Sequence, residues 1–350
     1  MLKNNFSQIK LGIIAKSFGF MSNGDEVLCH TLTNKNGIEL SIINYGATIT
    51  SLKIPISNGQ KVDVVLGFDK LEDYIKSFDL PSSPYFGSIV GRYAGRINNA
   101  SFLLNSKKIH LSKNQNAHQL HGGLKGFGQK FWKVIATTSG DNPSITFEYI
   151  SKNNEEKFPG ELNVNVTYTI TENNEFKVAF FATSSEDTIV NLTQHSYFNI
   201  DGHDKDIANQ ELFINSSKTL ETTQENIPTG KFKPLKNHPF DFTIQKECPL
   251  KIDNTFVLEN NNTIAASLFS KKNKLKMSVF TNQPAVHIYV GGNCFNTIKG
   301  KEKADYNAIS GICFETQNFP DAPNHANFPT AVLKKGNEYL HQTTFKFENL

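Results

Sequence analysis

Apolar and polar residues alternate along much of the chain. Every second position is apolar at 162–170, and the same alternation returns at 176–180, 275–279 and 286–290. Successive side chains of a β-strand point to opposite faces, so this period of two predicts strands with one buried face. Clusters of Asn, Gly, Ser and Pro separate these segments and predict turns.

Helical spacing is scarce by comparison. Short helices are expected only near Lys70–Lys76 and Asn262–Phe269. Many short strands without alternating helices favour an all-β fold, an antiparallel β-sandwich. The sequence has no long Ser/Gly/Pro linker, low-complexity tract or internal repeat, so residues 1–350 are expected to form a single domain.

The composition is that of a globular protein. Hydrophobic residues make up 38% of the chain and include 28 Phe, which is enough apolar material for a large core. The formal net charge is only +3, and the lysines are scattered among Asp and Glu. Nucleic-acid-binding proteins usually gather basic residues on one face, so we expect no nucleic-acid partner.

The cysteines and the N-terminal region bear on the cellular compartment. Cys29, Cys248, Cys294 and Cys313 are widely spaced without a CxxC pair, which is neither a disulfide framework nor a zinc signature. The apolar run at 11–15 is too short for a secretory signal, and no stretch approaches membrane-spanning length. These features predict a cytoplasmic protein that does not act at a membrane.

Arginine is confined to one short segment. The chain has 36 Lys plus Arg, yet its two arginines, Arg92 and Arg96, both lie in the glycine-rich stretch 91–96. Lysine cannot reproduce the planar, fork-shaped guanidinium, so at least one of the two is expected to need that geometry. The alternative is a buried structural ion pair.

Three histidines lie in segments richer in polar and small residues than strands require. His118 and His121 have HxxH spacing, but they lie among glycines and asparagines in a predicted loop without a third ligand nearby. A loop histidine that donates to a hydroxyl is favoured there over a metal site. His195 is surrounded by hydrogen-bonding side chains and followed by aromatic residues, so either a functional or a structural imidazole fits.

Two carboxylates and the single tryptophan complete the candidates. Glu315 follows Ile312 and Phe314 near the end of an apolar strand, where a carboxylate is costly unless it is paired or used. The alternative is a buried salt bridge, for example to one of the two arginines. Asp253 by itself reads as an ordinary turn residue. Trp132 fits a core position or a platform for a ligand equally well.

Five motifs together carry a resemblance to a known family. The ordered set resembles the aldose 1-epimerase (galactose mutarotase) family, and the likeness extends over nearly the whole chain: GRYAGRI at 91–97, LHGG at 120–123, NLTQHSYFN at 191–199, IDNTFVL at 252–258 and ETQNFPDAPN at 315–324. The resemblance implies a large twisted β-sandwich with an open sugar-binding cleft. It also implies that neither a metal nor an organic cofactor is needed.

The resemblance also implies roles for individual residues. Glu315 corresponds to the family's general base and His195 to its general acid. The sugar hydroxyls would be bound by Arg96, His121 and Asp253. Two departures bear on hydroxyl preference: Gly95 stands where many relatives have Asn, and Gln194 stands where Asn usually precedes the histidine.

The expected reaction is interconversion of the α and β anomers of a free aldose. Opening the ring requires a base at the C1 hydroxyl and an acid at the ring oxygen, and closure exchanges their roles. The alternatives are a hexose-6-phosphate 1-epimerase, a non-catalytic sugar-binding protein and a purely structural sandwich. The preferred sugar, glucose, galactose or another aldose, depends on loop geometry. We expect the sugar to be the partner molecule and the protein to be a monomer, with a dimer as the alternative.

Overall fold

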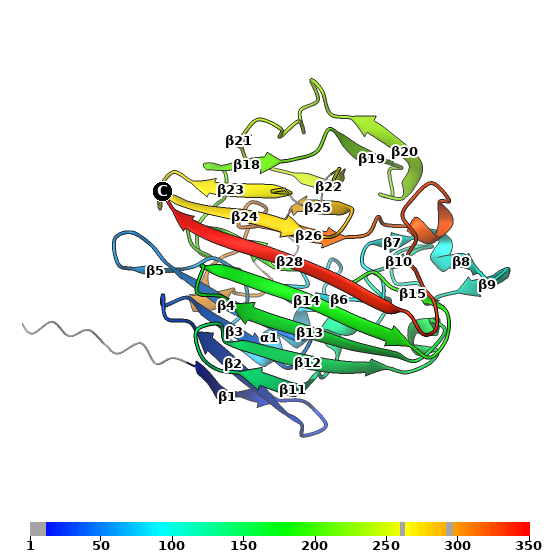
Figure 1. Ribbon diagram of the computed structural model, residues 1–350, viewed down its shortest axis with the longest axis horizontal. Helices are drawn as coiled ribbons and strands as arrows, with labels where there is room; N and C mark the ends of the chain where they lie inside the picture. The colour runs from blue at the N-terminus through cyan, green and yellow to red at the C-terminus, as the bar shows by residue number, and fades with distance from the viewer. Residues whose placement is uncertain (1–11, 260–262, 292–296) are drawn as a thin grey trace, which may run out of the picture.

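The computed structural model describes residues 12–259, 263–291 and 297–350 (Figure 1). Leu11, Asn262 and Cys294, which entered the sequence predictions, lie outside these ranges. The described chain is mostly strand, as the period-two pattern predicts, and its strands pair antiparallel within three large sheets.

The longest sheet lies at the front of Figure 1 and contains most of the alternating segments recognised in the sequence. Its strands, in spatial order, are β11 (Lys133–Thr138), β12 (Ser144–Ser151), β13 (Leu162–Ile170), β14 (Glu175–Ser184), β28 (Glu338–Asn349), β24 (Leu275–Thr281), β23 (Ala266–Ser270), β18 (Gln210–Ile214) and β21 (Lys246–Glu247).

Two further large sheets pack with it. One has the order β17 (Tyr197–Phe198), β26 (Ile312–Gln317), β25 (Ala285–Val290), β22 (Ile252–Val257), β19 (Lys218–Thr222) and β20 (Pro228–Pro234). The other runs in sequence order through β1 (Gly12–Phe20), β2 (Glu26–Thr33), β3 (Glu39–Ile43), β4 (Thr48–Pro55) and β5 (Lys61–Asp63).

Short elements connect these sheets. The paired short strands are β6 (Ile89–Val90) with β16 (Thr193–Gln194), β7 (Arg96–Ile97) with β10 (Gln119–Leu120), β8 (Ser101–Leu104) with β9 (Lys107–His110), and β15 (Thr188–Ile189) with β27 (Val332–Leu333). The helical segments are α1 (Leu71–Ser77) and the 3₁₀ turns Asn98–Ala100, Phe127–Gln129, Glu155–Lys157, Lys301–Lys303 and Ala322–Asn324.

The core lies between the sheets and follows from the alternation. On β13, Leu162 and every second residue after it are fully buried, while the residues between them are partly exposed. One hydrophobic cluster joins inward side chains from all three large sheets, for example Leu40, Val166 and Phe314. Trp132 is fully buried in this cluster, so of its two expected roles the structure gives it the core role.

The two expected helices have different outcomes. Helix α1 (Leu71–Ser77) forms where the sequence predicts it. The prediction of a helix near Asn262–Phe269 is wrong over the described part, because β23 (Ala266–Ser270) is a strand paired on both sides, with β18 and β24. Four of its five residues are buried, so its short apolar run lacks the alternation that would have marked it as a strand.

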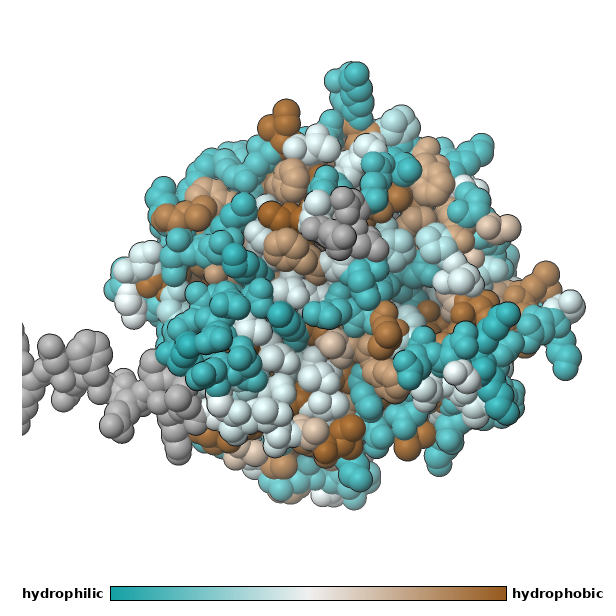
Figure 2. Space-filling model, viewed as in Figure 1, coloured by the Kyte–Doolittle hydropathy of each residue, from teal (hydrophilic) through white to brown (hydrophobic). Residues whose placement is uncertain are grey.

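The outer surface is mixed in character. On the face shown in Figure 2, hydrophilic side chains spread widely and hydrophobic ones occur in small separate groups. Within the described ranges, no helix is both long enough and apolar enough to cross a membrane.

Candidate active site

The floor of the candidate site is one face of the sheet that contains β22, β25 and β26. Alternation sends Ile288 on β25 and Phe314 on β26 into the core. The residues that alternate with these along each strand face the other side of the sheet and line a cleft of about 360 Å³. The cleft-facing residues on these three strands are Asp253, Thr255, His287, Tyr289, Glu315 and Gln317. Strand period therefore places two predicted site residues, Asp253 and Glu315, on the same floor.

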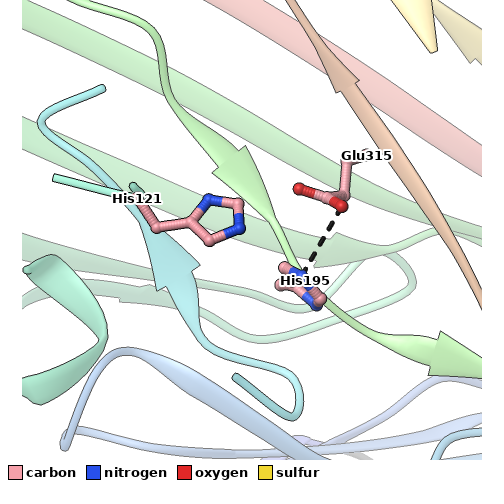
Figure 3. A group of neighbouring side chains, drawn as sticks. All are labelled: His121, His195 and Glu315. Carbon is pink, nitrogen blue, oxygen red and sulfur yellow. Dashed lines mark ion pairs between the residues drawn. The ribbon is translucent and has the colours of Figure 1, made fainter. Parts of the chain in front are cut away.

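Glu315 and His195 form the central contact of the cleft. Nε2 of His195 lies 3.5 Å from Oε1 of Glu315, and both side chains are almost fully buried (Figure 3). The other carboxylate oxygen, Oε2, is buried without a hydrogen-bond partner among the described residues. A buried carboxylate oxygen without a donor is costly, so this atom is left to accept a hydrogen bond from a ligand hydroxyl.

The backbone around His195 is fixed by the neighbouring strand segment. The amide of His195 donates to the carbonyl of Ser88, and the amide of Gly87 donates to the carbonyl of His195, at 3.0 and 2.9 Å. Gly87 has φ +65°, and a Cβ there would lie 2.0 Å from the carbonyl oxygen of Ile49. A glycine is needed for this close approach, and it lies in the glycine-rich segment recognised in the sequence.

Further contacts surround the His195 ring, among them those of Cys313 and Tyr85. Its Nδ1 lies 3.7 Å from the sulfur of Cys313, which is a long and weak contact. The Tyr85 ring lies over the imidazole at 5.8 Å between centroids with 31° between planes. Burial raises the pKa of Tyr85 to about 12, so its phenol stays neutral beside the pair.

His121 enters the cleft as a neutral donor. Its Nδ1 accepts a hydrogen bond from the amide of Gly95 at 3.3 Å, so in the neutral ring the proton is assigned to Nε2. Burial, together with the positive charges of His195 and Arg96, lowers the pKa of His121 well below its ordinary value. Figure 3 shows its ring pointing toward His195 and Glu315.

The loop that holds His121 depends on close backbone packing. A Cβ at Gly122, where φ is +87°, would lie 1.9 Å from the carbonyl oxygen of Gly91. Strand β10 pairs with β7, which puts Leu120 opposite Arg96. The glycines of the two motifs therefore allow the arginine segment and the histidine segment to pack against each other and face the same cleft.

Arg96 and Asp253 lie farther along the same cleft. Nε of Arg96 donates to the side-chain oxygen of Gln115 at 2.7 Å, and the guanidinium remains partly exposed to the cleft. Asp253 accepts from the amide nitrogen of Asn226 at 2.8 Å and pairs with Nε2 of His287 at 2.9 Å. Burial opposes ionisation, but the hydrogen bond and charge of His287 lower the pKa of Asp253.

The second arginine has a different role. Arg92 is 2% exposed, and its guanidinium donates to backbone carbonyls of four residues, Ser151, Lys152, Pro159 and Gly160. It also donates to the hydroxyl of Ser151. Of the two arginines, only Arg96 reaches the cleft. Arg92 uses its planar guanidinium to hold backbone oxygens together, as a clamp, rather than to form an ion pair.

The two histidines with HxxH spacing, His118 and His121, lie in different environments. His118 accepts from the amide of Asn99 and lies 3.4 Å from Glu225, whereas His121 faces the cleft. A different group has metal-ligand geometry, because donor atoms of His121, His195 and Glu315 all lie within 4.8 Å of one another. Two imidazoles and a carboxylate are ligands that zinc accepts, so this group could hold a metal ion.

The two residues that depart from the family motifs also lie in different surroundings. Gly95 lines the cleft with φ +80°, and a Cβ there would lie 2.9 Å from Pro320. Gln194 is buried and donates to the carbonyl of Gly87 and to the hydroxyl of Ser196. Of the two, only Gly95 lies where a bound ligand would meet it.

The structure thus brings all five predicted site residues to one cleft. Sequence reasoning missed the residues that support them, namely Tyr85, Gln115, Asn226 and His287. For His287 a signal existed, because a histidine alternates there with the apolar Val286 and Ile288. Gln115 and Asn226 lie in polar loops, where the sequence holds no comparable signal.

The fold and cleft define an all-β protein with a buried pair of histidine and glutamate in a cleft of small-molecule size. A sequence profile of the aldose 1-epimerase family matches residues 28–346. The chain is 36% identical over 341 residues to galactose mutarotase from Homo sapiens, covering 94% of this chain and 97% of that protein. It is 35% identical over 338 residues to aldose 1-epimerase from Haemophilus influenzae, covering 91% and 95% respectively.

Solved structures show the same architecture. An aldose epimerase homologue from C. elegans superposes with a TM-score of 0.84 at 28% identity, covering 91% of this chain and 98% of that one. Galactose 1-epimerase from Lactobacillus acidophilus has a TM-score of 0.83 at 23% identity, with 97% and 99% covered, and shows the shared fold. The chain belongs to the aldose 1-epimerase family and is an isomerase.

Proposed function

We propose that the protein interconverts the α and β anomers of free aldohexoses such as glucose and galactose. The observation that carries the proposal is the buried pair of His195 and Glu315, which lines a cleft of small-molecule size and whose Oε2 is unpartnered among the described residues. The cleft volume of about 360 Å³ falls within the usual range of small-ligand sites, about 300–1,000 Å³.

Ring opening assigns one proton transfer to each member of the pair. Glu315 removes the proton from the C1 hydroxyl, the C1–O5 bond breaks, and the electron pair stays on the ring oxygen. His195, as imidazolium, delivers its proton to that oxygen, which leaves an open-chain aldehyde. The two oxygens are bonded to the same carbon, so an acid and a base 3.5 Å apart are suitably spaced to serve both.

Closure reverses the transfers on the other face of the carbonyl. After rotation about the C1–C2 bond, His195 takes the proton from the C5 hydroxyl and Glu315 returns one to the C1 oxygen. Both groups end each cycle in their starting states. The carboxylate of Glu315, 3.5 Å from His195, is in place as the counter-charge of the imidazolium that opening requires.

The other predicted residues anchor the distal hydroxyls while C1 turns. Arg96 and neutral His121 are donors, and Asp253 is an acceptor, so the set can hold hydroxyls of both kinds. Binding through the distal part of the sugar leaves the anomeric carbon free to rotate. Holding the substrate in this way adds to the acid–base contribution.

Cleft composition favours a free sugar over the phosphorylated alternative. No lysine lines the cleft in the part of the chain that the structure describes. A phosphate group normally calls for several basic groups, and Arg96 is the one Lys or Arg side chain that lines the cleft among the described residues. The presence of both an acid and a base also distinguishes this protein from a binding module without chemistry.

Polarimetry tests the proposal directly. The optical rotation of freshly dissolved α-D-glucose, α-D-galactose and glucose 6-phosphate would be followed with wild-type protein, Glu315→Gln and His195→Asn. We expect faster decay to the same equilibrium rotation for the free sugars, reduced about 10²–10⁴-fold by each substitution.

Exposed residues supply matched controls. Glu338→Gln and His110→Asn make the same chemical changes on exposed strand positions and should keep wild-type rates. If the wild-type trace for both free sugars equals that of buffer, the proposal fails for these substrates. Acceleration with glucose 6-phosphate alone would instead establish the phosphorylated-sugar reading.

A further inference from the structure

A third histidine on the cleft floor is ion-paired to the sugar anchor and lies beside the base. His287 is on β25, between Asp253 on β22 and Glu315 on β26. We infer that His287 is a positioning residue: it holds Asp253 as a fixed acceptor and places a positive charge next to Glu315. This inference rests on the proposed function.

The contacts of His287 use both ring nitrogens. Nε2 lies 2.9 Å from Oδ1 of Asp253, and Nδ1 lies 2.8 Å from the hydroxyl oxygen of Thr255. In the imidazolium form both nitrogens donate, and Asp253 and Thr255 are both able to accept. The ring is therefore held from two sides in an orientation that suits its charged form.

Asp253 is held at both carboxylate oxygens. His287 contacts Oδ1, and the side-chain amide of Asn226 donates to Oδ2 at 2.8 Å. Each oxygen keeps a further lone pair for a ligand. A carboxylate fixed in this way accepts sugar hydroxyls in a set direction, which is what an anchor for a rotating substrate requires.

The link to the base comes from strand register. His287 and Glu315 are directly opposite on β25 and β26, so their side chains project on the same face about 4.5–5.5 Å apart at Cβ. Burial opposes the charged form of His287, but the hydrogen bond and charge of Asp253, with the charge of Glu315, raise its pKa. It therefore stays cationic at a pH where an ordinary histidine begins to lose its proton.

The remaining ionisable groups at the cleft act on the same equilibrium. Arg96 on β7 works against the His287 charge, and the positive charge of His287 contributes to keeping His121 neutral. The other titratable residues that line the cleft are His195, Tyr85 and Tyr289. The carboxylates of Asp253 and Glu315 lie on the two sides of His287. Removing the positive charge of His287 therefore leaves both carboxylates without this counter-charge.

The test substitutes His287→Gln, which keeps a side-chain amide donor for Asp253 but carries no charge. Removing a positive charge from the cleft floor favours the more protonated state of the cleft as a whole. Both limbs of the pH profile of kcat/KM should move upward, by roughly one pH unit. His110→Gln is the matched control, because it makes the same chemical change at an exposed strand position and should leave both limbs in place.

A second measurement is independent of turnover. NMR titration of the imidazole resonances, with His287 assigned by its absence from His287→Gln, should show it titrating above an ordinary histidine. In Asp253→Asn its midpoint should fall, since burial then opposes the charge with less compensation. A pH profile of His287→Gln that superposes on wild type, or a His287 midpoint that does not respond to Asp253→Asn, would overturn the inference.

The two measurements also separate this inference from the proposed function. If wild-type protein does not accelerate mutarotation, the proposed function fails, while the NMR titration still reports on the pair of His287 and Asp253. If mutarotation is fast but the profiles superpose, the function stands and the role of His287 is wrong.

Discussion

Replacing Arg92 by lysine should destabilise the protein strongly, although the charge is kept. The guanidinium makes five hydrogen bonds, from two terminal nitrogens, to four backbone carbonyls and one hydroxyl. These acceptors belong to the segments around Ser151 and Gly160, so the side chain ties two ends of one loop together. A lysine ammonium is a single nitrogen and can take the place of only one of the two terminal nitrogens, so at least the two acceptors of the other nitrogen lose their partner.

The size of the effect follows from those two losses. Hydrogen bonds to a charged group contribute about 1.5–3 kcal/mol each, so Arg92→Lys should lower the free energy of unfolding by about 3–6 kcal/mol. The whole free energy of unfolding of a globular protein is about 5–15 kcal/mol, so this loss is a large part of it. Burial already lowers the pKa of Arg92 to about 10, which indicates how little water reaches this site.

Urea unfolding followed by fluorescence of the single tryptophan, Trp132, measures the change, because that side chain is fully buried in the core. The same substitution four residues away, Arg96→Lys, is the control, since Arg96 is partly exposed and has a side-chain hydrogen bond to Gln115. We expect it to change stability by less than about 1 kcal/mol. The clamp role of Arg92 would be refuted if both variants lost the same free energy of unfolding, or if Arg92→Lys lost less than about 1 kcal/mol.

Two other predictions concern activity. Arg96→Lys should raise KM for aldohexoses roughly tenfold with kcat changed little, because one directed charge-assisted hydrogen bond to a hydroxyl is worth about 1.5 kcal/mol or more; an unchanged KM in the polarimetric assay would remove Arg96 from the site. Dialysis against a chelator should leave the mutarotation rate unchanged, because His195 must carry a proton on the nitrogen that faces Glu315. A rate lost on dialysis and restored by zinc would show that His121, His195 and Glu315 work as metal ligands.

The strands and the cleft floor could be anticipated from the sequence to a large extent. Alternation marks β13 over its full length, and the same period puts Glu315 on the face opposite Phe314. The motifs supplied the five site residues as a set. Their roles in catalysis, and the organisation of 1–350 as one domain, stay predictions.

What the sequence could not supply is which side chains meet. Asp253, His287 and Glu315 become neighbours because β22, β25 and β26 pair in one register, and that register depends on hydrogen bonds between segments more than 20 residues apart. Alternation fixes the face on which each residue lies but not the residue opposite. For the same reason β23 was mistaken for helix, since its strand character comes from partners on both sides.

The arginine segment shows the same limit in another form. Composition singled out Arg92 and Arg96 together, and the residue type was informative at both positions. Only the fold separates them, because Arg92 turns into the protein toward backbone carbonyls and Arg96 turns to the cleft. A residue that needs a planar guanidinium can need it for structure or for a ligand, and the sequence signal is identical.

The hydrogen-bond acceptors and the donors of the cleft come from two kinds of structure. The acceptors, Asp253 and Glu315, project from paired strands whose register fixes their separation. The donors, Arg96, His121 and His195, come from short strands and turns whose glycines allow close backbone packing. Loop positions change more easily than a strand register, so changes in hydroxyl preference are expected to arise among the donors and at Gly95. The spacing of the base and its neighbouring charges is set by the sheet, and it should persist while the preferred sugar changes.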